Sequence, residues 1–263
     1  MKILVLAGLL AFAALLPAAA ESEADLIAHA NPQVGVEKVT VAKDDRRTTF
    51  FFSPKGHAGP HKGLAILLPG GDGGRDFLPF CSTLAAQAFP VDWLTIQLVA
   101  PQWRPPSPEV TVWPSGLVKD AKAKFDTEDF IRAAIAEAAP RLEKKAPVVL
   151  LGWSSSGHAI ISAVQKLPEV RGVMLAGSRF AKGWARSRPG LKDKAFFLYH
   201  GETDAVCPMA DAVAAEEFLP KAGARAKLVK FAGGHGWPPG FDHFAALRGG
   251  LAWILETPPA VRP

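Results

Sequence analysis

The sequence predicts one α/β domain with a mostly parallel central sheet, an N-terminal antiparallel hairpin and helices on both faces. Three observations support this fold class. Short apolar runs alternate with segments of helical length, as in parallel sheets that are covered on both sides. Two β-rich segments near the N-terminus flank a charged turn, which is typical of a hairpin. The chain has 263 residues, 49% of them hydrophobic, which is enough to bury a full core.

The hairpin strands are expected at 34–42 (VGVEKVTVA) and 47–53 (RTTFFFS). Six buried strands are then expected over 64–69, 93–101, 147–152, 170–177, 195–201 and 224–233. Helical patterns cover residues 76–88, 127–145, 155–167, 209–222 and 241–256. In sheets of this kind, reactive groups collect in the loops beyond the carboxyl ends of the strands. The reactive side chains of this protein are therefore expected in those loops.

The first twenty residues have the layout of a secretory signal peptide. One lysine precedes the apolar stretch Ile3–Leu16, and a small-residue run, Ala18–Ala20, ends the segment. The apolar stretch is short for a bilayer span, and nothing later in the chain is long and apolar enough for one. We expect cleavage before Glu21, a single domain over 21–263, no stable membrane insertion and a periplasmic or secreted protein. An uncleaved membrane anchor is the alternative.

Charge and cysteine content exclude several classes of function. Without the N-terminal lysine the chain carries 29 basic and 25 acidic residues, a formal charge of +4, and the basic residues are scattered. A nucleic-acid-binding protein would show a basic stripe with aromatic platforms. Zinc would require more nitrogen and sulfur ligands at close spacing. We therefore expect neither nucleic acid nor metal nor cofactor, and pairing of Cys81 with Cys207 stays open.

A candidate nucleophile lies in VVLLGWSSSGH (148–158), where an apolar run breaks into three serines. A nucleophile at a tight strand-to-helix turn requires small residues two positions away on both sides. For Ser154 these positions are Gly152 and Ser156, whereas Ser155 would place the bulky Trp153 there. Ser154 is therefore the better candidate. The alternative is that the serines only cap an ordinary helix.

An attacking serine needs an imidazole base, and the base needs a carboxylate that orients it. Asp204 follows the expected strand 195–201, and His235 follows the last expected strand in a glycine-rich stretch. Glu202 is the alternative acid, and His243 is the alternative base. His200 is expected to be a structural residue.

Backbone amides near the serine predict an oxyanion hole, the group of donors that stabilises negative charge on a reacting carbonyl. The amide of Ser155 begins a helix, where the helix dipole favours negative charge. The second donor is expected in LLPGGDGGRDF, on Gly71 or Asp72, because glycines allow close backbone approach. A phosphate-binding loop is the alternative reading, but the spacing GxxxxGK[ST] is absent.

Four motifs, LLPGGDGG, GWSSSG, YHGETDAVCP and GGHGW, together resemble the α/β-hydrolase superfamily. Within it they are most similar to the phospholipase/carboxylesterase group that includes acyl-protein thioesterases, over roughly Leu64 to Leu255. The resemblance implies Ser154 as nucleophile, Asp204 as acid and His235 as base. Two departures stand out: GWSSSG replaces the group's GFSQGG, and Cys207 replaces the valine of HGxxDxxVP.

The sequence therefore predicts a secreted serine hydrolase that cleaves small-molecule, glycan or lipid esters through an acyl-enzyme intermediate. Trp113, Trp153 and Trp237 are expected either to line an apolar acyl pocket or to pack in the core. A thioesterase or peptidase with the same triad is an alternative, because the leaving group leaves no sequence signal. A binding protein that kept the fold without the chemistry is the other alternative.

Overall fold

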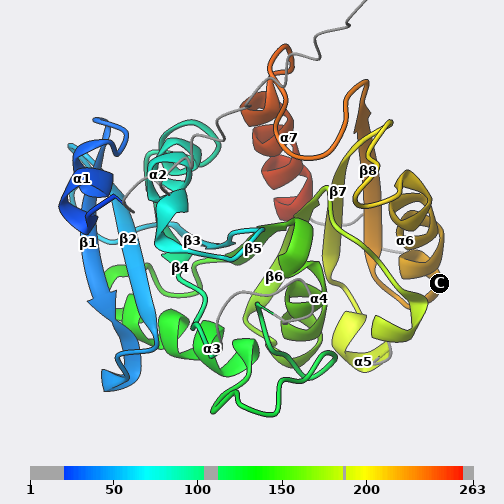
Figure 1. Ribbon diagram of the computed structural model, residues 1–263, viewed down its shortest axis with the longest axis horizontal. Helices are drawn as coiled ribbons and strands as arrows, with labels where there is room; N and C mark the ends of the chain where they lie inside the picture. Colours follow the sequence, from blue (N-terminus) through cyan, green and yellow to red (C-terminus); the bar gives the residue numbers. More distant parts are fainter. Residues whose placement is uncertain (1–20, 104–111, 186–187, 257–263) are drawn as a thin grey trace, which may run out of the picture.

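An eight-stranded sheet forms the centre of the molecule in the computed structural model, which describes residues 21–103, 112–185 and 188–256 (Figure 1). The expected signal peptide and part of the Pro-rich loop after residue 101 lie outside these residues. The strand order is β1-β2-β4-β3-β5-β6-β7-β8. The strands are β1 Val34–Thr40, β2 Thr48–Pro54, β3 Gly63–Leu68, β4 Trp93–Leu98, β5 Val148–Trp153, β6 Val170–Ala176, β7 Ala195–Gly201 and β8 Arg225–Phe231.

Only β2 runs against its neighbours, since it pairs antiparallel with both β1 and β4. The other adjacent strands pair in parallel. The predicted fold class is therefore confirmed: a mostly parallel sheet carries an antiparallel hairpin at its N-terminal edge.

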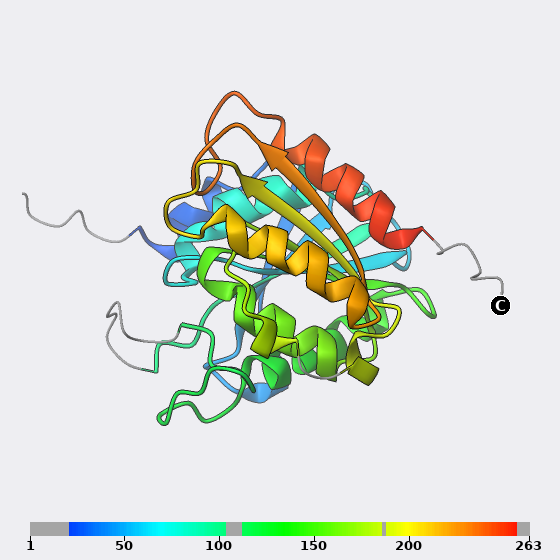
Figure 2. The ribbon, with the colours of Figure 1, turned by 90° about the vertical axis from the view of Figure 1, so that its right-hand side faces the viewer.

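Helices cover the sheet on both faces (Figures 1 and 2). The helices are α1 Glu23–Ala28, α2 Leu78–Gln87, α3 Thr127–Ala138, α4 Gly157–Lys166, α5 Arg188–Leu191, α6 Met209–Lys221 and α7 His243–Leu255. One core cluster contains buried residues of α1, α2 and α7, and the other contains buried residues of α3, α4, α5 and α6. Figure 2 shows α6 lying along the β7–β8 edge of the sheet.

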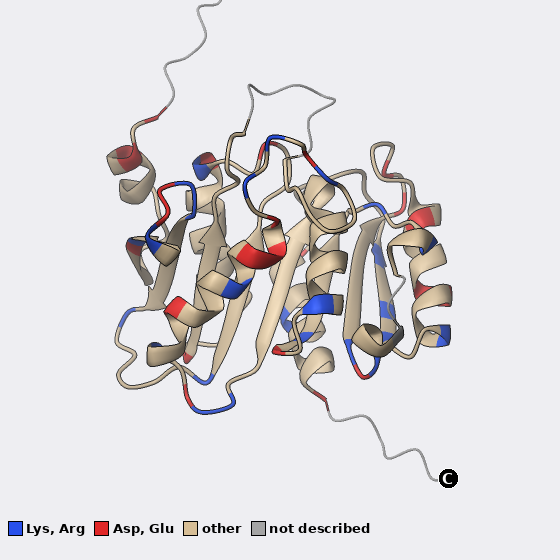
Figure 3. Ribbon diagram, turned by 90° about the horizontal axis from the view of Figure 1, so that it is seen from below, with Lys and Arg blue, Asp and Glu red and all other residues tan. Residues whose placement is uncertain are grey.

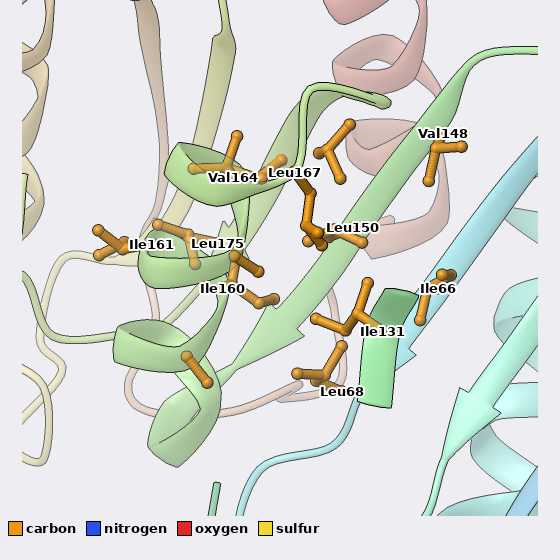
Figure 4. Close-up of a cluster of buried hydrophobic side chains, with 14 of the residues drawn as sticks. Ile66, Leu68, Ile131, Val148, Leu150, Ile160, Ile161, Val164, Leu167 and Leu175 are labelled. Carbon is orange, nitrogen blue, oxygen red and sulfur yellow. The ribbon is translucent and has the colours of Figure 1, made fainter. Parts of the chain in front are cut away.

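The apolar run of β5 illustrates why the central strands are mostly hydrophobic. Val148 and Leu150 pack into the cluster with α3 and α4, whereas Val149 and Leu151 pack into the cluster with α2 and α7. Successive side chains of a strand point to opposite faces, so a strand buried on both faces is mostly apolar, and polar residues occur in it only where a partner satisfies them. Figure 4 shows Leu150 among the α4 side chains, including Ile160.

Two parts of the expected helix pattern differ in the structure. The helix expected over 127–145 ends at Ala138 and continues only as a 3-10 turn over Ala139–Arg141. Pro140 has no N–H and its ring clashes with an α-helical backbone, so it ends the regular helix. The short helices α1 and α5 were not expected, because six and four residues are too few to show a hydrophobic period.

Charged residues of both signs are interspersed on the face drawn in Figure 3, and the central strands carry almost none. Among the described residues, no helix has the length and apolar character that a membrane span requires.

Candidate active site

Ser154 lies at a sharp turn between β5 and α4. The strand ends at Trp153, a 3-10 turn covers Ser154–Ser156, and α4 begins at Gly157. The φ angle of Ser154 is 54°, in the left-handed region that residues with a Cβ rarely adopt. Backbone strain of this kind concentrates at functional sites, where the surrounding structure holds it in place. The turn directs the chain abruptly from the sheet into the helix.

Small residues two positions from Ser154 make this turn possible. Ser156 is fully buried, and a Cβ added to Gly152 would overlap the side chains of Ser156 and Ile160. A Cβ added to Gly70 would lie 2.9 Å from the Cβ of Ser154. The loop after β3 therefore packs directly against the turn, as the steric argument from the sequence requires.

The substitution Gly152→Ala is expected to lower the free energy of unfolding by about 1–3 kcal/mol, the usual cost of overpacking a buried site. Ile160 and Ser156 are both fully buried, so neither side chain can move aside freely. Urea-induced unfolding of the purified variant measures the effect. The matched control is Gly249→Ala in α7, where an added Cβ meets no atom within 4 Å. That control should be neutral or stabilising, and equal losses in both variants would contradict the prediction.

Three side chains from distant parts of the chain form a hydrogen-bonded row at the carboxyl edge of the sheet. The Nε2 atom of His235, after β8, lies 3.0 Å from the Oγ atom of Ser154. The Nδ1 atom of His235 lies 2.8 Å from the Oδ2 atom of Asp204, after β7. A carboxylate accepts hydrogen bonds, so Nδ1 carries the proton and Nε2 accepts the bond from the Ser154 hydroxyl. This arrangement prepares Ser154 to lose its proton to His235.

Asp204 is held rigidly and stays ionised. Its Oδ1 atom accepts hydrogen bonds from the amides of Val206 and Cys207 at 2.8 and 2.7 Å. Burial raises the pKa of Asp204, but the hydrogen bonds from the Cys207 amide and the His235 ring lower it by more. The pKa therefore lies below the ordinary carboxyl value, and the group is negative at neutral pH.

The alternative acid and base take no part in this row. The Nε2–H of His243 donates to the Pro238 carbonyl at 2.7 Å, and its Nδ1 accepts from the Tyr199 hydroxyl at 2.8 Å. Both ring nitrogens are therefore occupied. His200 is buried and donates from Nε2 to the Cys207 carbonyl at 2.7 Å, as expected for a structural residue. Glu202 is exposed on the same loop as Asp204.

The glycine-rich loop (residues 70–74) brings free amides close to Ser154. Gly71 has a φ of 58°, and its carbonyl accepts a hydrogen bond from the Ser155 hydroxyl at 2.9 Å. Within the described residues, the amides of Gly71 and Asp72 donate to no protein acceptor. Both amides are therefore available to a ligand. The Ser155 amide belongs to the 3-10 turn Ser154–Ser156 that leads into α4.

No protein-family model and no curated protein sequence matches the chain. Solved structures do match. A candidate dienelactone hydrolase from Klebsiella pneumoniae subsp. pneumoniae has a TM-score of 0.64 at 14% identity, over 85% of this chain and 99% of its own. MGS-M1, an α/β-hydrolase enzyme from a Medee basin deep-sea metagenome library, has a TM-score of 0.58 at 14% identity, over 84% and 97%. The chain has the α/β-hydrolase fold.

A third match is an esterase. Esterase 2 of Thermogutta terrifontis, solved as the enzyme phosphorylated by paraoxon, has a TM-score of 0.56 at 14% identity, over 84% of this chain and 92% of its own. At this level of identity, the three structures show the fold that the chain shares with them.

The structure corrects the expectation that Trp113 lines a pocket of this hydrolase fold. Its side chain is fully buried, and its Nε1–H donates to the Pro69 carbonyl at 2.9 Å. A Cβ on Gly73 would lie 2.8 Å from the indole ring. Trp113 therefore supports the glycine-rich loop from within the core, where an indole can satisfy its N–H.

Trp153 and Trp237 belong to an aromatic cluster beside the Ser154 turn. Trp153 is 6% exposed, and its ring centroid lies 6.0 Å from that of Trp237. Phe77 and Phe80 each lie 5.7 Å from Trp153 in an edge-to-face arrangement. Trp237 and the two phenylalanines are half-buried, so part of the apolar surface of this cluster is exposed.

A pocket of about 430 Å³ borders Ser154, and the aromatic cluster does not line it. Its lining residues are Ser154, Ser155, His158, Arg179, Trp184, Val206 and Cys207. Sequence reasoning missed Arg179 and Trp184. Arg179 does follow the expected strand 170–177, and its place beyond the carboxyl end of a strand was the signal that could have identified it.

The two cysteines are not paired: Cys81 and Cys207 are both buried free thiols. Among the described residues, no group of three or more His, Cys, Asp or Glu side chains is placed to hold a metal ion.

Proposed function

We propose that this protein is a serine hydrolase that cleaves carboxylic esters through an acyl-enzyme intermediate. The observation that carries the proposal is the hydrogen-bonded row of Ser154, His235 and Asp204, with Ser154 on a strained turn. Free amides on the glycine-rich loop lie beside this row, and the fold neighbours include esterases. Nucleophile, base, orienting acid and oxyanion donors are the parts that acyl transfer requires.

In the first half of the reaction, the Ser154 hydroxyl attacks the ester carbonyl carbon and His235 takes its proton on Nε2. The carbonyl π electrons move to the oxygen, and the amides of Ser155 and of Gly71 or Asp72 stabilise the negative charge. Asp204 stabilises the imidazolium that forms. The tetrahedral intermediate then collapses, the bond to the alcohol oxygen breaks, and His235 returns the proton to the departing alcohol.

In the second half, water attacks the acyl-enzyme and gives its proton to His235. Collapse of the second tetrahedral intermediate breaks the bond to Ser154 Oγ, and His235 reprotonates that oxygen. One ester and one water become one acid and one alcohol, and the protein is unchanged. No metal or cofactor enters the scheme. We propose small-molecule, glycan or lipid esters as the substrates, and the expected signal peptide supports a site of action in the periplasm or outside the cell.

Labelling with a fluorophosphonate tests the proposal directly. The probe reacts with an activated serine and adds a stable phosphonyl group, so we expect one adduct on the folded wild-type protein, on the peptide that contains Ser154. Tandem mass spectrometry locates the adduct. Paraoxon serves as a second probe, because esterase 2 of Thermogutta terrifontis is phosphorylated by it.

Protein unfolded in urea before labelling is the matched control, because it retains the serine but loses the row that activates it. Absence of the adduct on folded protein would favour a binding protein that has the fold without the chemistry.

A further inference from the structure

We propose that Arg179 selects esters that carry a carboxylate, by binding that carboxylate in the pocket beside Ser154. This inference rests on the proposed function and specifies the substrate class. Arg179 and Ser154 line the same pocket, of about 430 Å³. The volume lies in the usual range for small-molecule sites, so one end of a small ester can occupy the pocket while its carbonyl lies at Ser154.

The loop after β6 places Arg179 against the candidate site. Gly177 follows the strand with a φ of 50°, and a Cβ there would lie 3.4 Å from the Asp204 carboxylate and 3.6 Å from the His235 ring. A Cβ on Gly157, the first residue of α4, would lie 2.9 Å from the Cβ of Ser178. The loop is thus packed against the hydrogen-bonded row and the Ser154 turn, which positions the backbone of Arg179, while its side chain is exposed to solvent.

The guanidinium is anchored but its charge is not neutralised. One of its terminal nitrogens donates to the Val206 carbonyl at 3.1 Å. In the part of the chain that the structure describes, no carboxylate forms an ion pair with Arg179. The neighbouring Cys207 does not supply negative charge either: burial and the nearby Asp204 carboxylate raise the pKa of its thiol to about 11. The guanidinium also contacts the Cys207 sulfur, which is a weak and uncharged partner, so its remaining N–H groups are available to an anion.

The described residues that line the pocket do not neutralise this positive charge, and the Asp211 carboxylate of α6, which acts on Cys207 from nearby, forms no ion pair with Arg179. Burial lowers the pKa of His158, so that ring is neutral at pH 7, and its Nε2 donates to the Trp113 carbonyl at 3.0 Å. Asp204 is enclosed, with a side chain that is 0% exposed and bonded to His235. The N-terminus of α4, a helix of ten residues, adds a partial positive charge on the same side. Of the pocket-lining residues that the structure describes, Arg179 alone carries a fixed charge.

A carboxylate fits the donor geometry of this site. The planar guanidinium presents paired donors that match the two oxygens of a carboxylate. The pocket also offers the Trp184 ring and the Val206 side chain, which suit a short hydrocarbon chain between the carboxylate and the ester. Hydrolysis leaves the recognised carboxylate unchanged: a dicarboxylic half-ester and water give the dicarboxylate and an alcohol, with release of one proton.

Two matched substrate pairs test the proposal on the wild type and on Arg179→Gln. The acyl-side pair is the mono-p-nitrophenyl ester of glutarate and its methyl-capped neutral diester. Release of p-nitrophenol measures the rate of hydrolysis of both. The alcohol-side pair is the acetate ester of γ-hydroxybutyrate and the acetate ester of γ-hydroxybutyramide. Titration of the released acid measures the rate of hydrolysis of both. The expected result is a wild-type preference for the anionic member of one pair, and that pair reports which side of the ester occupies the pocket.

Arg179→Gln should lower kcat/KM for the preferred anionic ester about 10- to 100-fold, mainly through KM, because it removes an interaction made in both ground and transition states. The neutral partner should change by less than about twofold. Arg179→Lys should retain part of the preference as a point charge. The control Lys182→Gln removes a charge from the same loop outside the pocket and should leave the preference intact. Added salt should weaken the preference in the wild type.

The possible failures are distinguishable. Hydrolysis of neutral esters by the wild type with no preference for either anionic substrate would overturn the inference about Arg179 and leave the proposed function standing. Equal losses on anionic and neutral esters in Arg179→Gln would also overturn it, since Arg179 would then only hold the Val206 loop in place. A folded wild type that cleaves no ester and takes no fluorophosphonate label would overturn the proposed function itself.

Discussion

Replacing Ser154 with alanine is expected to lower turnover of a short p-nitrophenyl ester by about 10³-fold or more while the protein stays folded. The Oγ atom of Ser154, 3.0 Å from His235 Nε2, is the atom that forms the acyl bond in the proposed reaction. A loss of this size corresponds to about 4 kcal/mol of transition-state stabilisation. Steady-state rates measure the loss, and thermal unfolding shows whether the fold is intact.

A glycine variant and a distant serine keep this experiment decisive. Ser154→Gly should be equally inactive and at least as stable as the wild type, because glycine adopts a φ of 54° without strain. Ser53→Ala, in the edge hairpin at the end of β2, is the matched control and should keep full activity. Substantial activity in either Ser154 variant would refute the proposed nucleophile.

Replacing Asp204 with asparagine is expected to lower turnover about 10³- to 10⁴-fold, the range that loss of the correct histidine tautomer costs in a triad of this kind. The Oδ1 position of Asp204 accepts from two backbone amides, so the asparagine carbonyl must take that position. The asparagine NH2 group then faces His235 Nδ1. That nitrogen becomes an acceptor, Nε2 carries the proton, and His235 can no longer take the proton of Ser154.

Glu202→Gln is the matched control on the same loop. Glu202 is exposed, so its loss of charge should change kcat by less than about twofold and leave stability within about 0.5 kcal/mol. The two variants together decide between the two acids that the sequence allowed. Loss of activity in Glu202→Gln with retention in Asp204→Asn would reverse the assignment.

Strand and helix positions were readable from sequence where the pattern was long and regular. The run AFFLYHG matches β7, Ala195–Gly201, residue for residue, because a strand buried on both faces is mostly apolar, and its one ionisable ring, His200, is hydrogen-bonded. The helix expected over 127–145 was too long, since the hydrophobic pattern continues past Pro140 although the backbone cannot. Helices as short as α5 carry no periodic signal.

The Ser154 turn was predictable for a different reason. Its requirement for small neighbours is local, so GWSSS by itself favours Ser154 over Ser155. The role of Trp113 was not predictable in the same way. Its neighbours along the chain do not show that Pro69 and Gly73 lie against its ring, so core and pocket were equally compatible with VWPSG.

The sequence by itself determined the order of strands and helices, the strained turn at Ser154 and the loops that carry an acid and an imidazole. These features depend on residues near one another in the chain, whose sterics and hydrophobic periods are read directly. Only the tertiary structure decided that His235 lies between Ser154 and Asp204, that His243 is occupied by Tyr199 and Pro238, and that Arg179 shares a pocket with Ser154. Those relations depend on how parallel strands align at one edge of the sheet, a packing outcome that no local stretch of sequence contains.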